Sequence, residues 1–203
     1  YNYIFLTSDF DMNFQVNLGS NDYYGADGIA FVMQPNSTGM GNSGEGIGYQ
    51  GISPSIAVEY DTWMNDDPSY DHIAIHRNGI TNSTYGAVAG PVSASVSSDN
   101  IEDGLWHSTH IKWSASAHTL TVYFDEVLRL TYTNDIVANT FGGNPKVYWG
   151  FTGATGSATN LQKVCITSVN FTEFGINVSK TNVSCNGAND GTASVISIDG
   201  GTP

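Results

Sequence analysis

The stretch from residue 56 to residue 79 constrains the fold more than any other part of the chain. It begins as an apolar strand, in which alternate side chains point to opposite faces, so Val58 and Tyr60 share one face. Glu59 and Asp61 share the other face, where two neighbouring carboxylates repel each other and are costly to bury unpaired. A divalent cation between them would remove both costs, so the pattern predicts a metal-binding strand within a β-sheet.

Further metal-ligand types follow in the next loop, up to a histidine that opens the second strand. Calcium takes about six to eight oxygen ligands, whereas a transition ion such as manganese accepts an imidazole beside carboxylates. The residues that suit calcium are Asp61, the carbonyl of Trp63, Asn65 and Asp67. The residues that suit a transition ion are Glu59, Asp61, Asp67 and His72. The alternative is a solvated acidic loop, helped by the turn chemistry of Asn-Asp-Asp-Pro.

This segment resembles the metal loop of the L-type lectins, the legume-lectin family that includes concanavalin A. The family pattern is Val-Glu-(aromatic or Leu)-Asp-Thr-(aromatic)-x-Asn, followed by Asp-Pro and a histidine. Here it corresponds to residues 58–65, followed by Asp67-Pro68 and His72. The resemblance implies a calcium ion and a second divalent ion, manganese. The implied ligands are Glu59, Asp61, Trp63, Asn65, Asp67 and His72.

Three other motifs occur in the family order, so the resemblance covers roughly residues 3–174. Residues 25–31 resemble the segment whose Asp accepts hydrogen bonds from sugar hydroxyls after a cis Ala-Asp peptide. Residues 44–49 resemble the glycine loop whose backbone N–H reaches the sugar, and residues 150–157 resemble the loop that flanks the sugar pocket. Trp63 is the expected aromatic platform for a sugar face. The implied sugar-binding residues are Asp27, Gly44, Glu45, Gly46, Trp63, Asn65, Gly156 and Ser157.

The rest of the chain is typical of an all-β extracellular domain. Of its 203 residues 23 are glycine, and only 12% are charged. Many short strands with Gly, Asn and Ser turns predict a sandwich or jelly roll, and the resemblance implies a concanavalin A-like jelly-roll β-sandwich. Period-2 alternation predicts strands at residues 10–18, 147–151 and 164–171, and a hairpin made of residues 106–113 and 119–131.

The composition changes after Phe174, and residues 175–203 open a new strand pattern. The pieces Cys-Asn-Gly-x-x-Asp-Gly-x-Ala and Gly-Gly-Thr-Pro resemble the start of a repeat in large surface adhesins of gliding Bacteroidetes. We therefore expect an L-type lectin domain at residues 1–174 and the beginning of a small β repeat module at residues 175–203. The alternative is a Ser/Thr-rich linker. Cys165 and Cys185 permit one internal disulfide, or their partners lie in other sequence.

Charge and hydropathy limit the partners. The formal net charge is −13 with only 6 Lys plus Arg, which argues against binding to nucleic acid or to anionic membranes. No apolar run approaches the length of a membrane span, so direct membrane insertion is not expected. The resemblances imply a secreted or cell-surface location, with glycans and further repeats of the same polypeptide as partners.

These observations predict a calcium-dependent carbohydrate-binding domain of a bacterial adhesin connected with gliding motility, and not an enzyme. One alternative is a glycoside hydrolase, but laminarinase-like enzymes of this architecture use Glu-x-Asp-x-x-Glu, and Met64 stands where the second Glu would fall. Another alternative is a structural spacer that binds no sugar. His107, His110 and His118 lack a nucleophile context, so we expect them at surface or edge positions.

Overall fold

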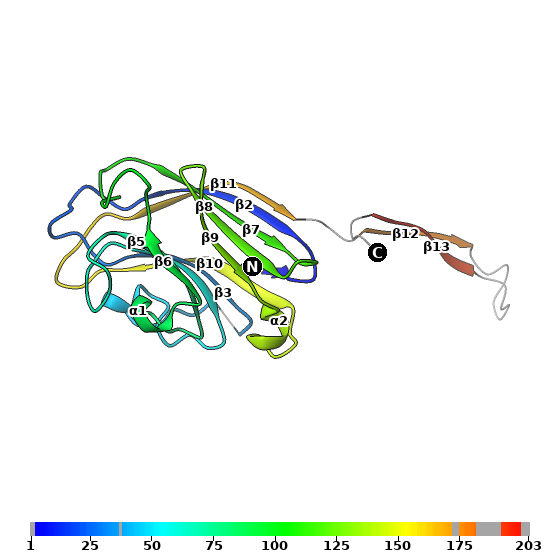
Figure 1. The fold of residues 1–203 in the computed structure, drawn as a ribbon. Helices are drawn as coiled ribbons and strands as arrows, with labels where there is room; N and C mark the ends of the chain where they lie inside the picture. Colours follow the sequence, from blue (N-terminus) through cyan, green and yellow to red (C-terminus); the bar gives the residue numbers. More distant parts are fainter. Residues whose placement is uncertain (1–2, 37, 172–174, 182–191, 200–203) are drawn as a thin grey trace.

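The computed structural model describes residues 3–36, 38–171, 175–181 and 192–199, the last two ranges mainly through their backbone. Residues 3–171 form a sandwich of two antiparallel β-sheets with very little helix (Figure 1). The two α-helices, α1 (Ser83–Gly86) and α2 (Ile136–Asn139), are single turns, and η1 (Gly44–Gly46) is a short 3₁₀ helix. The predicted all-β sandwich is therefore confirmed.

Six strands form the sheet that carries the acidic segment, here called the front sheet. In spatial order they are β1 (Tyr3–Phe5), β10 (Lys146–Ala154), β3 (Gly28–Gln34), β4 (Ile56–Asp61), β5 (His72–Arg77) and β6 (Ala89–Ser93). Every neighbouring pair is antiparallel. The predicted strand at residues 147–151 lies inside β10, and the acidic strand β4 lies between β3 and β5.

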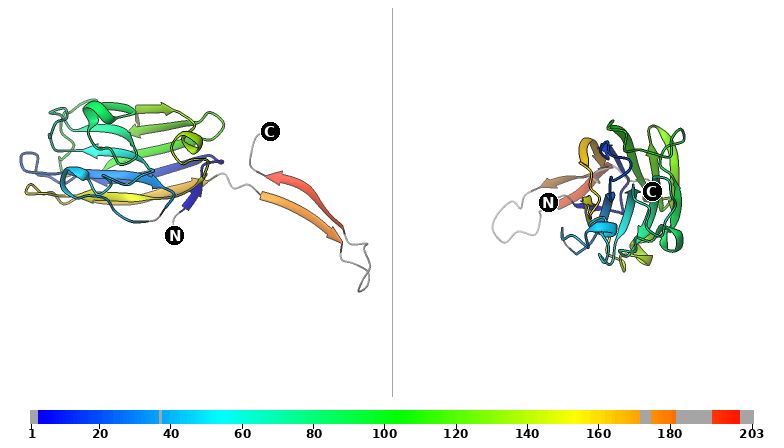
Figure 2. Two further views of the ribbon diagram at one scale, coloured as in Figure 1. Left: turned by 90° about the horizontal axis from the view of Figure 1, so that it is seen from below. Right: turned by 90° about the vertical axis from the view of Figure 1, so that its left-hand side faces the viewer.

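Five strands form the second sheet, here called the back sheet. In spatial order they are β11 (Lys163–Phe171), β2 (Phe10–Asn17), β7 (His107–Ser114), β8 (Thr119–Phe124) and β9 (Val127–Thr133). The two views of Figure 2 show this sheet stacked on the front sheet. Burial alternates along β2, β7 and β8, as expected for strands with one face in the core and one toward water.

The main core fills the space between the sheets. It contains the apolar positions of the alternating strands, including Phe14 and Trp113 from the back sheet and Phe31, Val58 and Tyr60 from the front sheet. Trp113 is almost fully buried, and its indole N–H donates to the Leu6 carbonyl at 2.9 Å. Burial of these large side chains supplies the main favourable free energy of folding.

The outer face of the front sheet is also buried, which is what places the acidic residues out of water. Ala57 belongs to a second apolar cluster with Ala30, Val32, Ile47 and Tyr49. This cluster lies where residues 47–52 cover the sheet, so all six residues of β4 are buried. Glu59 and Asp61 therefore point into protein, as the alternation along this strand predicted.

Two sequence-based expectations about the back sheet are wrong. Residues 119–131 do not form one strand, because a two-residue turn separates β8 from β9. Asp125 and Glu126 have φ values of 45° and 63°, the left-handed conformation that such tight hairpin turns need. The Asp-Glu pair lacks the Asn or Gly that usually signals this turn.

The second error concerns His107, which is neither exposed nor on an edge strand. Strand β7 lies between β2 and β8, and His107 is only 9% exposed. Its two ring nitrogens lie 2.7 Å from Asp125 and 3.2 Å from Asp103. These carboxylates come from the segments before β7 and after β8, and no local sequence pattern predicts that they enclose the imidazole.

Strands β12 (Gly175–Thr181) and β13 (Thr192–Asp199) pair with each other in a two-stranded sheet of their own. Figure 1 shows this hairpin outside both sheets of the sandwich. A new strand pattern after residue 174 is thus observed, while its assignment to an adhesin repeat stays a prediction. Cys165 is exposed and unpaired, and Cys185 lies outside the described residues. In the part of the chain that the structure describes, every helix is too short to span a membrane.

We predict that a chain ending at Phe174 keeps the sandwich folded. The reason is that β12 and β13 pair only with each other and supply no strand to either sheet of the sandwich. Its thermal unfolding, followed by circular dichroism, should remain a single cooperative transition with a midpoint within a few degrees of the full chain. Loss of cooperative unfolding would show that the hairpin is an integral part of the sandwich.

Candidate functional site

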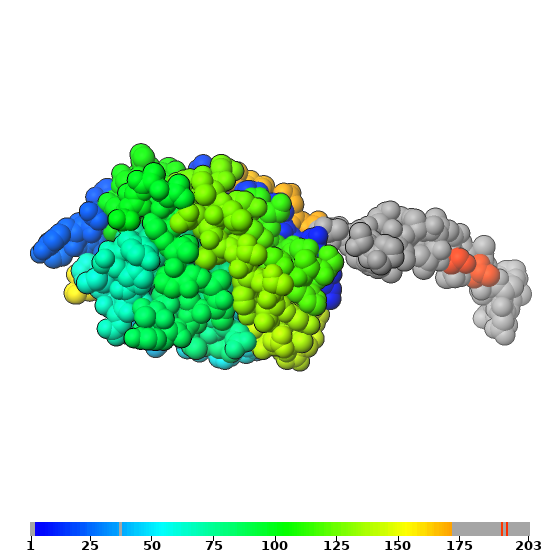
Figure 3. Space-filling view, viewed as in Figure 1, coloured from blue at the N-terminus to red at the C-terminus, as the bar shows by residue number. Residues whose placement is uncertain are grey.

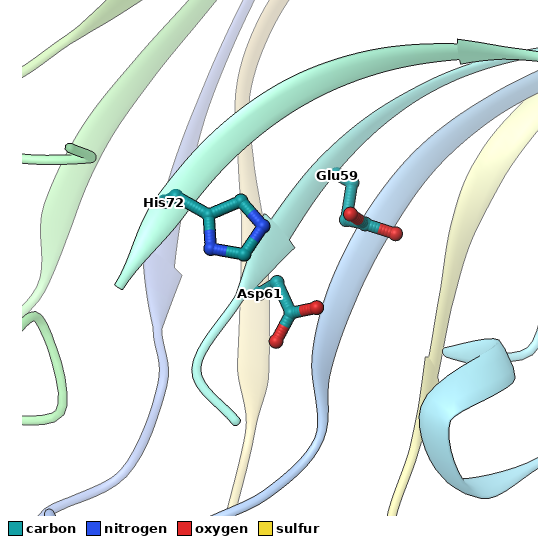
Figure 4. Close-up of side chains that lie close together, drawn as sticks. All are labelled: Glu59, Asp61 and His72. Atoms are coloured by element: carbon teal, nitrogen blue, oxygen red, sulfur yellow. The ribbon is translucent and has the colours of Figure 1, made fainter. Parts of the chain in front are cut away.

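Within the described part of the chain, one group of side chains has the composition of a metal site: Glu59, Asp61 and His72. One ligand atom from each of these residues lies within 4.8 Å of the other two. Figure 4 shows the three side chains close to one another on neighbouring strands. All three residues are at most 3% exposed, so the group is enclosed by protein.

The register of two neighbouring strands creates this cluster. Asp61 is the last residue of β4 and lies directly opposite His72, the first residue of β5. Glu59 precedes Asp61 by two residues, so both carboxylates point to the same face of the sheet. A shift of either strand by one residue would turn these groups to the other face, which is why the pairing of β4 with β5 matters for the site.

Glu59 is held by hydroxyl groups from two other segments. Tyr49 donates its phenol to one carboxylate oxygen, and Ser83 donates its hydroxyl to the other at 3.1 Å. His76 lies beside them, with Nε2 3.2 Å from Glu59 and 3.0 Å from the Ser83 hydroxyl. Burial, followed by the charge of Glu59, raises the pKa of Tyr49 well above its usual value, so the phenol remains a donor.

Asp61 experiences strong electrostatic repulsion in this site. Burial raises the pKa of its carboxyl well above the usual value, and the neighbouring charge of Glu59 raises it further. The backbone N–H of Trp63 donates to Asp61 at 2.8 Å, which opposes these effects in part. The ionised form of Asp61 thus needs an additional positive charge close to it.

His72 has the state expected of a metal ligand. Its Nδ1 lies 3.3 Å from the Tyr70 carbonyl, and its buried Nε2 has no hydrogen-bond partner. Burial lowers the pKa of the imidazole, which favours the neutral form that ligates metals. A proton on Nδ1 would donate to Tyr70 and leave the Nε2 lone pair free. Together with two repelling carboxylates, this arrangement fits a divalent cation.

The other predicted metal ligands lie in the adjoining loop. Asp67 accepts a hydrogen bond from the Ser83 N–H at 2.8 Å, and its charge contributes to the raised pKa of Asp61. Asp67 is therefore near the cluster, although it is not one of the three residues that meet within 4.8 Å. Trp63 is partly buried and Asn65 is exposed. The ligand roles of Asp67, Trp63 and Asn65 stay predictions.

Asp27 immediately precedes β3, the strand that pairs with β4 beside the metal cluster. The Ala26–Asp27 peptide is cis, as the resemblance implied. The carbonyl of Asp27 accepts from the Thr62 N–H at 3.1 Å, so this segment is bonded to the residue that follows Asp61. Asp27 is only 6% exposed, and its Oδ2 is buried without a hydrogen-bond partner. Burial, followed by the charge of Glu45, raises the pKa of Asp27.

Two loops with predicted sugar-binding residues adjoin Asp27. A side-chain carbon at Gly156 would lie 3.6 Å from Asp27 Oδ2, so any side chain at this position would pack directly against the carboxylate. Ser157 is exposed in the same loop. In η1, Gly46 donates its N–H to Ser43, whereas the N–H groups of Gly44 and Glu45 occupy the helix start, where intrahelical acceptors are lacking. Because Glu45 raises the pKa of Asp27, both belong to one electrostatic neighbourhood.

Several residues that shape the site were not identified from sequence. Ser83 and His76 contact Glu59, and the fully buried Tyr49 is a partner of this carboxylate rather than an exposed platform for sugar. Asn160 and Glu102 hold the loops beside Asp27. Only His76 had a sequence signal that could have identified it, because it follows His72 by four residues and shares the same face of the strand.

Comparison with known proteins now identifies the fold family. Residues 1–168 match the family model described as the legume lectin beta-barrel domain of the L-type lectins. The chain belongs to the L-type lectin family. The match covers the whole sandwich up to β11, including the cluster of Glu59, Asp61 and His72 and the segment of Asp27.

Two curated relatives are longer proteins that are similar to this chain over part of their length. A probable L-type lectin-domain containing receptor kinase S.5 of Arabidopsis thaliana is 26% identical over 181 residues, which are 81% of this chain and 26% of that protein. A serine-rich adhesin for platelets of Staphylococcus aureus is 26% identical over 191 residues, which are 82% of this chain and 8% of that protein. The lectin domain thus spans about a quarter or less of these relatives.

A solved relative has the same fold. Lectin I-B4 of Griffonia simplicifolia, determined in a metal-free form, is 29% identical. Its TM-score is 0.62, and the alignment covers 81% of this chain and 71% of the Griffonia chain. The predicted concanavalin A-like architecture is therefore confirmed for the lectin domain, while a repeat module after residue 174 stays a prediction.

We predict that calcium and manganese raise the melting temperature of the lectin domain. An ion at about 100 times its dissociation constant stabilises the folded state by about 2.7 kcal/mol, equivalent to roughly 5–10 °C for a chain of this size. Asp61→Asn should lose this increase. In EDTA, however, Asp61→Asn should be at least as stable as the wild type, because it removes one of two repelling buried carboxylates. Differential scanning fluorimetry with and without the ions measures both effects.

The matched control is Asp66→Asn, which makes the same chemical change at an exposed carboxylate of the same loop. This variant should keep the full increase in melting temperature with calcium and manganese. A wild-type melting temperature that is identical in EDTA and in both ions would contradict the assignment of a metal site.

Proposed function

We propose that this lectin domain binds carbohydrate and that bound calcium, with manganese as a second ion, holds the binding loops in place. The observation that carries the proposal is Asp27, whose Oδ2 is buried and lacks a donor at an edge where three loops meet. A sugar offers neighbouring hydroxyl groups as donors, and charge-assisted hydrogen bonds to a carboxylate are among the stronger ones. Membership of the L-type lectin family supports the same conclusion.

The other binding contacts follow from the position of each loop. Gly44 and Glu45 would donate backbone N–H groups to a sugar oxygen, with Gly46 completing that loop. Asn65 would donate its side-chain amide, and Trp63 would present its ring to the C–H face of the sugar. Gly156 and Ser157 would flank the sugar, with Gly156 leaving room beside Asp27 Oδ2. Differences in these last two positions would tune the choice of sugar.

The ions act structurally in this proposal and do not activate water. Glu59, Asp61, Asp67 and His72 would hold the transition ion, while Asp61, the Trp63 carbonyl, Asn65 and Asp67 would hold calcium. Calcium would thereby fix the backbone of the loop that carries Trp63 and Asn65. Hydrolysis is not proposed, because Met64 stands where the paired carboxylic acid of a retaining glycosidase on this strand would be needed.

We further propose that the domain works in a secreted or cell-surface bacterial adhesin, in which residues 175–203 begin a repeat. The similarity to part of the Staphylococcus aureus adhesin supports an adhesive context. The separate β12–β13 hairpin supports a second module after the lectin domain. Glycans on a cell surface or in a polysaccharide, together with further repeats of the same polypeptide, would then be the partners.

The decisive experiment measures binding to methyl glycosides of galactose, glucose, mannose and N-acetylgalactosamine by isothermal titration calorimetry in calcium and manganese. We expect binding of at least one glycoside, and its loss in EDTA. Asp27→Asn keeps the shape of the side chain but turns one acceptor into a donor. The substitution should weaken binding by roughly 1.5–3 kcal/mol, about ten- to a hundredfold, because a sugar hydroxyl would then face an unmatched group.

The matched control is Asp66→Asn, which makes the same chemical change at an exposed carboxylate of the loop after β4. This variant should bind the glycoside like the wild type. The melting temperature of Asp27→Asn in calcium should stay near that of the wild type. If Asp27→Asn instead lost its ions and unfolded, Asp27 would belong to the metal scaffold, and equal binding by Asp27→Asn would place the sugar elsewhere.

A further inference from the structure

Asn160 connects two loops that border Asp27. Its side-chain oxygen accepts from the backbone N–H of Ser20 at 3.2 Å, and its side-chain amide donates to the Asn21 carbonyl at 3.2 Å. These bonds join the loop of residues 19–25 to the loop of residues 155–162. A backbone bond from the Thr159 N–H to the Tyr24 carbonyl, 2.9 Å long, adds a third connection. The two loops lie side by side at one end of the sandwich (Figures 1 and 3).

Glu102 is a buried hydrogen-bond partner of the Asn160 side chain. The Asn160 amide donates to one carboxyl oxygen of Glu102 at 2.6 Å, a short hydrogen bond, and Glu102 is only 2% exposed. The other carboxyl oxygen of Glu102 is buried and has no hydrogen-bond partner. A buried carboxyl is costly to leave without its hydrogen-bond donors, so the short bond to Glu102 strongly restrains the position of Asn160.

The backbone around this pair approaches too closely for any side chain. A Cβ atom added to Gly25 would lie 2.1 Å from Glu102 Oε1 and 2.5 Å from Asn160 Nδ2. A Cβ atom added to Gly19 would lie 1.8 Å from Asn160 Oδ1, and Gly19 also has a φ of +96°. Two glycines thus let the loop of residues 19–25 close around Asn160 and Glu102.

Both loops lead directly to the carboxylate of Asp27. The loop of residues 19–25 ends two residues before it, and the loop of residues 155–162 carries Gly156, which lies next to Asp27 Oδ2. Gln162, at the end of the second loop, donates to the Ala26 carbonyl at 3.0 Å. A displacement of Asn160 would therefore move both segments that border the carboxylate.

We propose that Asn160, held by the buried carboxyl of Glu102, is a positioning residue that fixes both loops beside Asp27 in the geometry required for sugar binding. The proposal rests on the sugar-binding function proposed above, and it adds residues that do not touch the sugar. Asn160 acts through the loops, and Glu102 acts through Asn160.

The ionisation of Glu102 gives this arrangement a distinct pH dependence. Burial raises the pKa of Glu102 to about 7, the hydrogen bond from Asn160 and the nearby Thr62 hydroxyl oppose this rise in part, and the charges of Asp71 and Asp22 add to it. The folded protein therefore holds a proton on Glu102 between about pH 4.5 and pH 7 that the unfolded chain does not hold. This contribution to stability is largest near pH 4.5 and is lost as the pH rises to about 7.

The main test is Asn160→Asp, which keeps the acceptor oxygen but removes both hydrogen bonds donated by the amide. At pH 8 the new carboxylate faces ionised Glu102, so we expect at least tenfold weaker binding of the methyl glycoside that the wild type binds most tightly among the four above. At pH 5.5 Glu102 is protonated and can donate a hydrogen bond to the new carboxylate. The ratio of wild-type to variant affinity should therefore be smaller than at pH 8. Asn139→Asp, at the exposed last residue of α2 at the other end of the sandwich, is the matched control and should bind normally at both pH values.

Glu102 provides a second pair of variants. Glu102→Gln keeps an oxygen that can accept from Asn160, whereas Glu102→Leu has a similar size and no acceptor. The Gln variant should therefore bind the glycoside at least tenfold more tightly than the Leu variant. The wild type should lose stability between pH 4.5 and pH 7 as its buried carboxyl ionises, whereas Glu102→Gln has no carboxyl to ionise. The melting temperature of Glu102→Gln minus that of the wild type should therefore increase over this pH range. Equal sugar affinities of these two variants, together with wild-type affinity for Asn160→Asp at pH 8, would overturn the proposal.

Amide hydrogen exchange separates this proposal from the proposed function. In Asn160→Asp at pH 8, residues 20–25 and 156–161 should exchange at least tenfold faster than in the wild type, while β7 and β8 should be unchanged. If the wild type binds none of the four glycosides, the proposed function fails, and unchanged exchange in both loops would show that Asn160 does not hold them either. Faster exchange confined to the two loops would support the positioning role independently of sugar.

Discussion

The electrostatics of one buried cluster dominate this structure. Two carboxylates on the same strand and an imidazole on the next lie within 4.8 Å of one another, and none is more than 3% exposed. Without a cation, such a group must hold protons or suffer strong repulsion, as the raised pKa of Asp61 indicates. Hydroxyl groups of Tyr49 and Ser83 stabilise Glu59 but add no positive charge. The architecture is therefore best explained as a cage for a divalent ion.

This cluster connects to the proposed sugar edge through a single rung of the front sheet. Asp61 lies opposite Gly28, and the next residue, Thr62, donates its N–H to the carbonyl of Asp27. Gly28 has a φ of +136°, and a Cβ atom there would lie 2.2 Å from the Tyr60 carbonyl. The close approach of β3 to β4 at this point requires glycine. Any ion that fixes Asp61 would therefore also restrain the backbone at Asp27.

A different interaction, between Asn160 and Glu102, lies at the loops beside Asp27. Asn160 and Glu102 form a neutral or singly charged hydrogen-bonded pair, in contrast to the multiply charged metal cluster. One carboxylate, Asp27, thus lies between two buried polar groups that come from distant parts of the chain. The metal cluster and the Asn160–Glu102 pair together offer a way to preorganise a site that is made mainly of loops on a rigid sheet.

Local patterns predicted the parts of the site that strands define. Alternation placed Glu59 and Asp61 on one face, and the strand that begins at His72 brought the imidazole beside them, so the three members of the cluster were predicted from sequence. The resemblance to L-type lectins added the cis peptide before Asp27. The partners of Glu59 were missed, because Tyr49 and Ser83 reach it from segments 10 and 24 residues away with no common pattern.

The errors have physical causes of the same kind. The division between β8 and β9 depends on two residues with positive φ, a conformation that Asp125 and Glu126 adopt without the usual glycine or asparagine. The burial of His107 depends on carboxylates contributed by two turns. Asn160 and Glu102 are 58 residues apart, and their contact follows from the stacking of the sheets rather than from any local periodicity.

Direct location of the ion tests the central claim most sharply. Crystals of the protein soaked in manganese and measured near the manganese absorption edge reveal bound ions through their anomalous signal. The account predicts an anomalous peak within about 2.0–2.4 Å of carboxylate oxygens of Glu59 and Asp61 and of Nε2 of His72. A well-ordered crystal with no peak among these three side chains, or with peaks only at exposed carboxylates, would contradict it.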